Sequence, residues 1–290
     1  MKPIYRSEDG ERQVRERYQA FLQRWPVAHQ QFRLATSQGE TFGIASGPEG
    51  APPLLLLHGG AANSAMWMGE IAAFAQKFRV YCVDLIGEPG LTAAARPPLA
   101  SNAYAAWLDD VLRGLSIARA SLLGISLGGW LALDYATRRP ERVERLAVLC
   151  PGGVGRQKLG IVFATIFLGM CGGWGKHKLM ERILGRAPAD PAPGLKAFID
   201  FMALIHRHFR PRMVKLPVFS DDALRRLQMP VLAIVGGRDV LLDSKQTKRR
   251  LEQCAPKAQV VYLPNAGHLI SGQTARLVEF LSERENEIAF

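Results

Sequence analysis

The chain has 290 residues, a length that fits one large α/β domain or two small ones. Hydrophobic residues make up 48% of it and charged residues 22%, close to the globular average, so a sizeable core is available and disorder is not the expected state. The formal net charge of +11 comes with basic clusters in separate elements and with no nucleic-acid motif, so we expect a solvated basic surface and no nucleic-acid partner.

The cysteines and the N-terminus indicate the compartment. The four cysteines are widely spaced and form no CxxC pair, so they predict neither a disulfide framework nor a metal site. The N-terminal residues are polar and lack the apolar core of a signal peptide, so we expect a cytoplasmic protein. The longest uncharged segment, residues 159–175, is shorter than a typical membrane span, and we expect no stable membrane insertion.

In chain order, the first predicted element is a helix over residues 9–25, within an N-terminal helical extension at 1–28. A hairpin follows, with "QFRLAT" and "ETFGIAS" as strands around "SQG". Continuous apolar runs then predict buried parallel strands at "PLLLLHGG", "FRVYCVDLIG", "ASLLGIS", "ERLAVLCPGG", "MPVLAIVGGRD" and "AQVVYLPNAGH". Helical patterns between and after them cover 66–77, 104–115, 127–138, 245–254 and 274–283. This alternation predicts an α/β fold with a sheet covered on both faces.

The alternation breaks once, over residues 154–227. This stretch is helical in pattern, is rich in Gly and Pro, and offers no strand. We therefore expect an α/β core formed by residues 29–153 and 228–290, with a helical cap inserted at 154–227.

A candidate nucleophile lies in Gly124–Ile125–Ser126–Leu127–Gly128, which satisfies G-x-S-x-G. The motif follows an apolar strand and opens a helix, as the strained turn of a nucleophile elbow requires. Small residues around Ser126 let the helix start pack closely on adjacent strands. The pattern alone is weak because glycine–serine turns are common, and its strand–turn–helix context strengthens it.

A serine hydroxyl needs a base, and the base needs an orienting carboxylate. His268 follows the last buried strand and Asp239 follows the strand before it, so both are expected at the same sheet edge as Ser126. Asp243, which we expect to cap the next helix, and Asp84, at another strand end, are alternative carboxylates.

Donors for a developing oxyanion are expected from two backbone amides. One is the N–H of Leu127, directly after the nucleophile. The other is the N–H of Gly60 or Ala61, in the glycine loop "HGGAANSAMW", and we favour Gly60. His58 is expected to hold this loop rather than to react.

These residues resemble the α/β-hydrolase superfamily, from about residue 31 onward. More narrowly, "IASGPEGAPPLLLLHGG", "VDLIGEPG" and "ISLGG" resemble bacterial carboxylesterases of the type that hydrolyses naproxen esters. The resemblance implies an eight-stranded, mostly parallel sheet with flanking helices and a helical cap, and no cofactor. It also implies Ser126, Asp239 and His268 as the catalytic triad.

The implied reaction is carboxylic ester hydrolysis through an acyl-enzyme, on a hydrophobic small-molecule ester. An apolar pocket is expected to draw on Ala61, Trp67, Phe163, Phe167 and Leu269. A lactonase or carbon–carbon bond hydrolase of the same fold stays open, as do a membrane-associated lipase, a receptor-like homologue that binds ligands without catalysis, and a homodimer.

Overall fold

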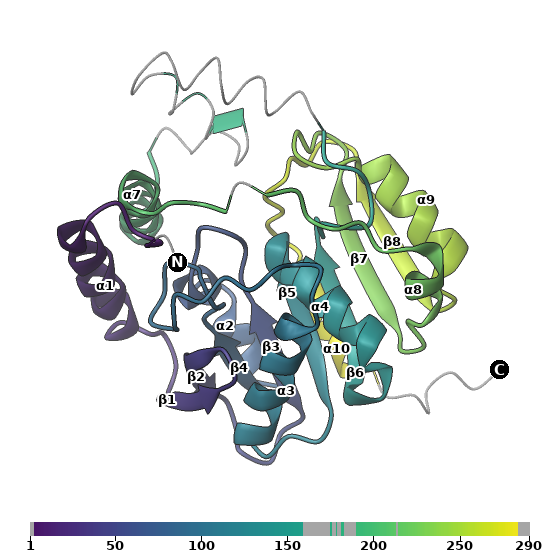
Figure 1. Cartoon of the computed structure of the whole chain (residues 1–290), viewed down its shortest axis with the longest axis horizontal. Helices are drawn as coiled ribbons and strands as arrows, with labels where there is room; N and C mark the ends of the chain where they lie inside the picture. Colours follow the sequence, from purple (N-terminus) through teal and green to yellow (C-terminus); the bar gives the residue numbers. More distant parts are fainter. Residues whose placement is uncertain are drawn as a thin grey trace.

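The computed structural model describes residues 3–158, 175, 178, 181–182, 190–212 and 214–283. Its centre is an eight-stranded sheet in the order β1-β2-β4-β3-β5-β6-β7-β8 (Figure 1). β1 pairs with β2, and β2 with β4, in antiparallel fashion, while the remaining pairs are parallel. The strands are β1 (His29–Thr36), β2 (Gly39–Ser46), β3 (Pro53–Leu57), β4 (Arg79–Val83), β5 (Ala120–Ile125), β6 (Val143–Leu149), β7 (Val231–Gly236) and β8 (Ala258–Leu263). The predicted hairpin and all six predicted parallel strands are confirmed.

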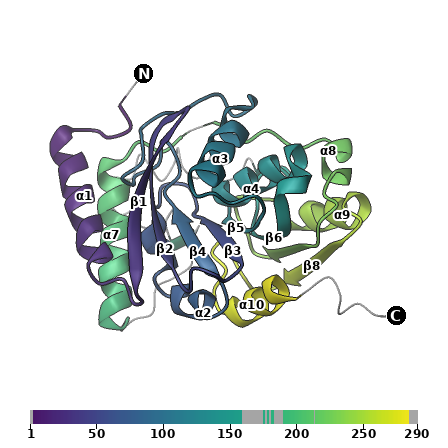
Figure 2. The same ribbon diagram turned by 90° about the horizontal axis from the view of Figure 1, so that it is seen from below.

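The apolar strands bury side chains on both faces of the sheet. Successive side chains of a strand point to opposite faces, so Leu55 and Leu57 join one core cluster and Leu54 and Leu56 join the other. Helices α3 (Ala103–Gly114), α4 (Leu127–Arg138) and α9 (Ser244–Cys254) contribute to the first cluster. Helices α2 (Ile71–Ala75) and α10 (Thr274–Ser282) cover the opposite face (Figure 2).

The N-terminal helix α1 (Glu8–Leu22) lies beside α7 (Pro193–His208), as both views show. Ser7 caps α1 by accepting from the Gly10 N–H at 3.1 Å. Aromatic rings join the two helices, with the Phe21 and Phe201 centroids 5.0 Å apart. The helix ends three residues earlier than predicted, because Trp25 leaves it and donates its indole N–H to the Ser46 hydroxyl at 3.1 Å.

One predicted helix is wrong. Instead of a single helix over 66–77, the chain forms the short 3-10 helix η1 (Ser64–Trp67) and then α2. Asn63 caps η1 through the Ala65 N–H at 3.2 Å, and Gly69 lies in the break between the two pieces. A glycine in this position disfavours a continuous helix.

The expected cap region is described only in part. Within 154–227 the described residues form α7 and the short helix α8 (Asp221–Arg225), and no extended strand. Gln157 and Phe209 each form an isolated bridge, to Leu242 and Tyr5 respectively. No helix among the described residues is long and apolar enough to cross a membrane.

Candidate active site

Ser126 occupies a strained turn between β5 and α4. Its φ of 53° and ψ of −106° lie outside the regions that L-residues favour. The turn is tight because a Cβ at Gly124 would overlap the carbonyl of Gly128, and one at Gly128 would overlap those of Leu57 and His58. Glycine at both positions therefore lets α4 start against the sheet and present the half-buried Ser126 at the strand ends.

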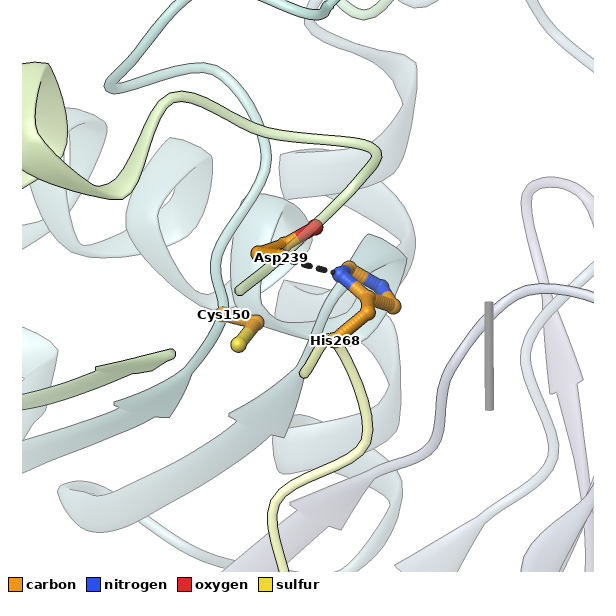
Figure 3. A group of neighbouring side chains, drawn as sticks. All are labelled: Cys150, Asp239 and His268. Atoms are coloured by element: carbon orange, nitrogen blue, oxygen red, sulfur yellow. Dashed lines mark hydrogen bonds and ion pairs between the residues drawn. The ribbon is translucent and has the colours of Figure 1, made fainter. Parts of the chain in front are cut away.

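His268 bridges Ser126 and Asp239. Its Nε2 atom lies 2.9 Å from Ser126 Oγ, and its Nδ1 atom lies 2.8 Å from Asp239 Oδ2. The second contact is drawn in Figure 3, where Asp239 and His268 meet from separate loops. The three side chains therefore form a continuous hydrogen-bonded path of the kind that lets an imidazole remove a hydroxyl proton.

Asp239 is held as a carboxylate. Burial, the largest single influence, would raise its pKa on its own, but the hydrogen bond and the charge of His268 and two backbone donors together outweigh it, and the net shift is downward. The N–H groups of Leu241 and Leu242 add to this by donating to Oδ1 at 2.7 and 3.1 Å. Oδ2 is thereby left for His268, so the carboxylate is oriented as well as charged.

The two alternative carboxylates have other partners. Asp243 caps α9 by accepting from the Gln246 N–H at 3.0 Å. Asp84 is fully buried and accepts from the Tyr18 hydroxyl at 2.8 Å and from the hydroxyl and N–H of Ser64 at 2.7 and 2.9 Å. Asp84 therefore ties α1 to the loops after β3 and β4.

Cys150 lies beside the acid–base pair, a neighbour that the sequence interpretation did not identify. Among the described residues, Cys150, Asp239 and His268 form one group whose metal-ligating atoms all lie within 4.8 Å of one another (Figure 3). Burial, followed by the nearby Asp239 charge, raises the pKa of the Cys150 thiol to about 12. A protonated thiol is neither a good nucleophile nor a good metal ligand, so this arrangement favours an inert side chain.

The glycine loop after β3 places Gly60 beside Leu127, the residue that follows Ser126. The Leu127 side chain lies 3.6 Å from the position that a Cβ would take on Gly60. Neither the Gly60 nor the Leu127 N–H donates to an acceptor within the described part of the chain. The Ala61 N–H, in contrast, is taken by Glu88 Oε2 at 2.6 Å. Of the two loop amides considered from the sequence, Gly60 is thus the one whose N–H has no acceptor among the described residues.

His58 fixes this loop through both ring nitrogens. Its Nε2 accepts from the Leu85 N–H at 2.9 Å, and its Nδ1 faces the Gly59 carbonyl at 2.8 Å. Complete burial lowers the pKa of the ring, which outweighs the opposing effects of Asp84 and Gly59. A neutral ring that donates from Nδ1 satisfies both contacts.

The predicted substrate-contacting residues differ in their surroundings. Ala61 is half-buried with a φ of 54°, and Leu269, next to His268, is 42% exposed. Trp67 is 3% exposed within the core, and its indole N–H has no hydrogen-bond partner among the described residues. Phe163 and Phe167 lie outside the described residues.

Comparison with known proteins identifies the family of the chain. The profile of the Alpha/beta hydrolase family matches residues 54–280. The chain belongs to the alpha/beta hydrolase family. This hydrolase is 34% identical over 262 residues to the Bacillus subtilis carboxylesterase YbfK, with 88% of each chain covered. It is 31% identical over 276 residues to a B. subtilis protein named uncharacterized carboxylesterase nap, covering 88% of this hydrolase and 85% of that protein.

A solved structure supports the same family assignment. The crystal structure of naproxen esterase from B. subtilis superposes on this hydrolase with a TM-score of 0.80 at 31% identity, covering 94% of this chain and 97% of that one. The resemblance to the naproxen-esterase type of hydrolase, which the sequence motifs predicted, is confirmed.

Proposed function

We propose that this hydrolase cleaves carboxylic esters bearing a hydrophobic group, by acyl transfer through Ser126. The observation that carries the proposal is the hydrogen-bonded path from Ser126 Oγ through His268 to Asp239, with contacts of 2.9 and 2.8 Å. The carboxylesterases that share 31 and 34% identity over most of the chain support the same reaction class.

In the first step, Ser126 Oγ forms a bond to the ester carbonyl carbon while His268 Nε2 takes the hydroxyl proton. The carbonyl electron pair moves onto oxygen and gives a tetrahedral oxyanion. When this intermediate collapses, the bond to the alcohol oxygen breaks, and His268 returns its proton to the departing alcohol. Asp239 keeps the imidazole oriented and stabilises its charged form.

In the second step, His268 takes a proton from water, and the resulting hydroxide attacks the acyl-enzyme carbonyl. When the second intermediate collapses, the bond between the acyl carbon and Ser126 Oγ breaks, His268 returns its proton to Oγ, and the carboxylic acid leaves. We assign the N–H groups of Gly60 and Leu127 to both oxyanions, since neither has an acceptor among the described residues. Loss of one such donor costs about 3 kcal/mol of transition-state stabilisation.

The apolar surroundings favour a hydrophobic substrate. Ala61 and Ile125, which flank the reacting groups, pack against the same core cluster as Phe198 and Met202 of α7. We assign residues 154–227 to a cap that supplies the remaining pocket wall, with Phe163 and Phe167 as its expected substrate contacts. We also retain Trp67 and Leu269 as expected lining residues of the proposed pocket.

A panel of p-nitrophenyl esters, with acyl chains from acetate to laurate and with charged analogues, tests the substrate class. Hydrolysis that prefers hydrophobic esters and disappears in Ser126→Ala would support the proposal. Turnover of charged esters only would contradict the substrate class. Turnover only of lactones or of a vinylogous diketone, run in the same screen, would replace ester hydrolysis by one of those reactions.

Labelling by a fluorophosphonate probe separates catalysis from mere ligand binding. Covalent modification of the wild-type chain at Ser126 is expected, because the probe reacts with activated serines. Absence of labelling would favour a ligand-binding protein, and activity that rises sharply above the micelle threshold of a substrate would indicate a lipase.

A further inference from the structure

Glu88 is a buried acid that the proposed reaction does not use. It lies in the loop between β4 and α3, and only 3% of its surface is exposed. Its Oε2 atom accepts from the Ala61 N–H at 2.6 Å, across 27 positions of the chain. Hydrogen bonds to a charged acceptor are stronger than neutral ones, so this contact fixes the turn around Ala61 when Glu88 is ionised.

The turn that Glu88 holds is strained. Ala61 has a φ of 54°, in the left-handed region that costs a residue with a Cβ about 1–2 kcal/mol. Gly60, the preceding residue, is the proposed oxyanion donor and lies against Leu127, the second donor. The backbone of Ala61 therefore needs a stabilising contact from elsewhere in the chain, and Glu88 provides it. This contact is at the Ala61 N–H, one peptide group after the Gly60 N–H that is the proposed oxyanion donor.

Two arginines and a tyrosine lie near enough to interact electrostatically with the Glu88 carboxylate. Arg96 donates to the carbonyls of Gly87 and Arg210 at 2.9 and 2.8 Å. Arg212 donates to Pro97 O at 3.1 Å and to the hydroxyl of Tyr104 at 2.8 Å. Both guanidiniums are thus committed to other acceptors, and they act on Glu88 through their charge.

Burial dominates the ionisation of this group. It raises the pKa of Glu88 to about 7, although the Ala61 N–H and the charges of Arg96 and Arg212 oppose the shift. The carboxylate therefore takes up its proton near neutral pH, where a free glutamate is fully ionised.

We propose that Glu88 is a positioning residue that, when ionised, holds the Ala61 turn so that the Gly60 N–H faces the oxyanion. This inference rests on the proposed function and deepens it. Protonation replaces a charge-assisted bond by a weaker neutral one, so oxyanion stabilisation falls as pH drops through the ionisation of Glu88. Because the ground-state ester does not need this donor, the effect falls on kcat more than on KM.

Two substitutions at Glu88 distinguish the effect of its negative charge from the effect of its side-chain length. Glu88→Gln keeps the shape and removes the charge, whereas Glu88→Asp keeps the charge and shortens the side chain by one methylene. Glu70→Gln is the matched control, because Glu70 also has its pKa raised by burial and makes no side-chain capping bond at the start of α2. For each protein, kcat and KM for a p-nitrophenyl ester and the fluorophosphonate inactivation rate are measured over about pH 5 to 9.

In Glu88→Gln we expect kcat and the inactivation rate at high pH to fall about tenfold, with KM changed by less than about twofold. Because His268 is the base in both proteins, the contribution of Glu88 is the ratio of the wild-type kcat to that of Glu88→Gln, which we expect to rise from about one at pH 5 to about ten at pH 9. Glu88→Asp is expected to lower kcat at every pH while keeping the wild-type shape of the profile, and Glu70→Gln to match the wild type.

The proposal is overturned if Glu88→Gln keeps the wild-type kcat, or loses kcat while its pH profile keeps the wild-type shape. If Glu88→Gln fails to fold, Glu88→Asp decides alone, and a wild-type kcat in that variant overturns the proposal. A wild-type chain that neither hydrolyses esters nor reacts with the probe would instead refute the proposed function.

Discussion

Nε2 of His268 lies 2.9 Å from Oγ of Ser126, although 142 positions separate the two residues in the chain. The contact arises because β5 and β8 belong to the parallel part of one sheet and end at the same edge. Loops that follow such strands bring their side chains together regardless of distance along the chain. The hydroxyl is thereby within reach of a base before any substrate binds.

Ser126→Ala is expected to abolish ester hydrolysis while leaving the fold unchanged. Removing a serine nucleophile lowers kcat by about 10⁶-fold in enzymes of this type. Alanine adopts the strained turn with about the same penalty as serine, so the melting temperature should change little. Hydrolysis of a p-nitrophenyl ester, fluorophosphonate labelling and thermal unfolding check this. Labelling that persists in the variant would point to a different nucleophile.

Asp239→Asn is expected to lower kcat by about 10⁴-fold with little change in KM, because an amide cannot stabilise the imidazolium. Asp243→Asn serves as the matched control: it replaces a helix cap and should leave kcat unchanged. The folded state also depresses the pKa of Asp239, so its stabilising contribution is present above the ordinary value of 3.8 and is lost in acid. Equal kcat losses in the two variants would contradict the assignment of Asp239.

The strands and the site residues on their ends could be predicted because their signals are local. Each buried strand is an uninterrupted apolar run, and Ser126, Asp239 and His268 lie in the turns and loops that follow three of them. The helix over 66–77 is predicted wrongly because apolar periodicity outweighed Asn63, which caps η1, and Gly69, which lies between η1 and α2. In that segment, the residues that cap and interrupt helices determine the structure more than the apolar periodicity does.

The contacts around the site that the sequence did not reveal are set by loop packing. Nothing in "IGEPG" indicates that Glu88 will meet the Ala61 N–H, since that pairing depends on how two loops cross. Cys150 could have been placed at the shared sheet edge, because it directly follows β6. Its closeness to Asp239 and His268 depends on the strand order, which the apolar runs leave open.

Gly128→Ala is expected to destabilise the chain by more than about 3 kcal/mol. A methyl group at this position would overlap the carbonyl oxygens of Leu57 and His58, which belong to the rigid β3 strand and its loop. Helix α4 would have to move away from the sheet, so activity should fall as well. Chemical denaturation measures the loss. Gly194→Ala, where a methyl group meets nothing within 4 Å, should change stability by less than about 1 kcal/mol.

Tyr18→Phe is expected to lower the free energy of unfolding by about 1–3 kcal/mol, because the buried Asp84 loses the donor that lies 2.8 Å away. Tyr5→Phe provides a matched comparison. The Tyr5 hydroxyl is buried near the Arg15 guanidinium and makes no well-aligned hydrogen bond within the described part of the chain, so its removal should cost less than that of the Tyr18 hydroxyl. Denaturant unfolding of both variants tests the pair, and equal losses would show that ring packing rather than the Asp84 bond matters.

Glu88→Gln is expected to stabilise the folded chain at pH values above about 7. Burial raises the Glu88 pKa from its ordinary value of 4.5 to about 7, so between these values the folded chain holds a proton that the unfolded chain has lost. Stability therefore falls as pH rises through this window. At about 1.4 kcal/mol per pKa unit, the charged group costs about 3 kcal/mol once it is ionised in both states.

The stability advantage of Glu88→Gln over the wild type should therefore grow between about pH 5 and pH 8, while its kcat at the upper end falls. Denaturant unfolding of both proteins at the two pH values measures the difference, and Glu70→Gln controls for removing a partly buried carboxyl elsewhere. An advantage that does not change with pH would mean that Glu88 ionises in the folded chain as it does in the unfolded one. If Glu88→Gln gains stability with rising pH and also loses kcat, then the ionised Glu88 side chain lowers the stability of the folded chain while it supports catalysis through the Ala61 turn.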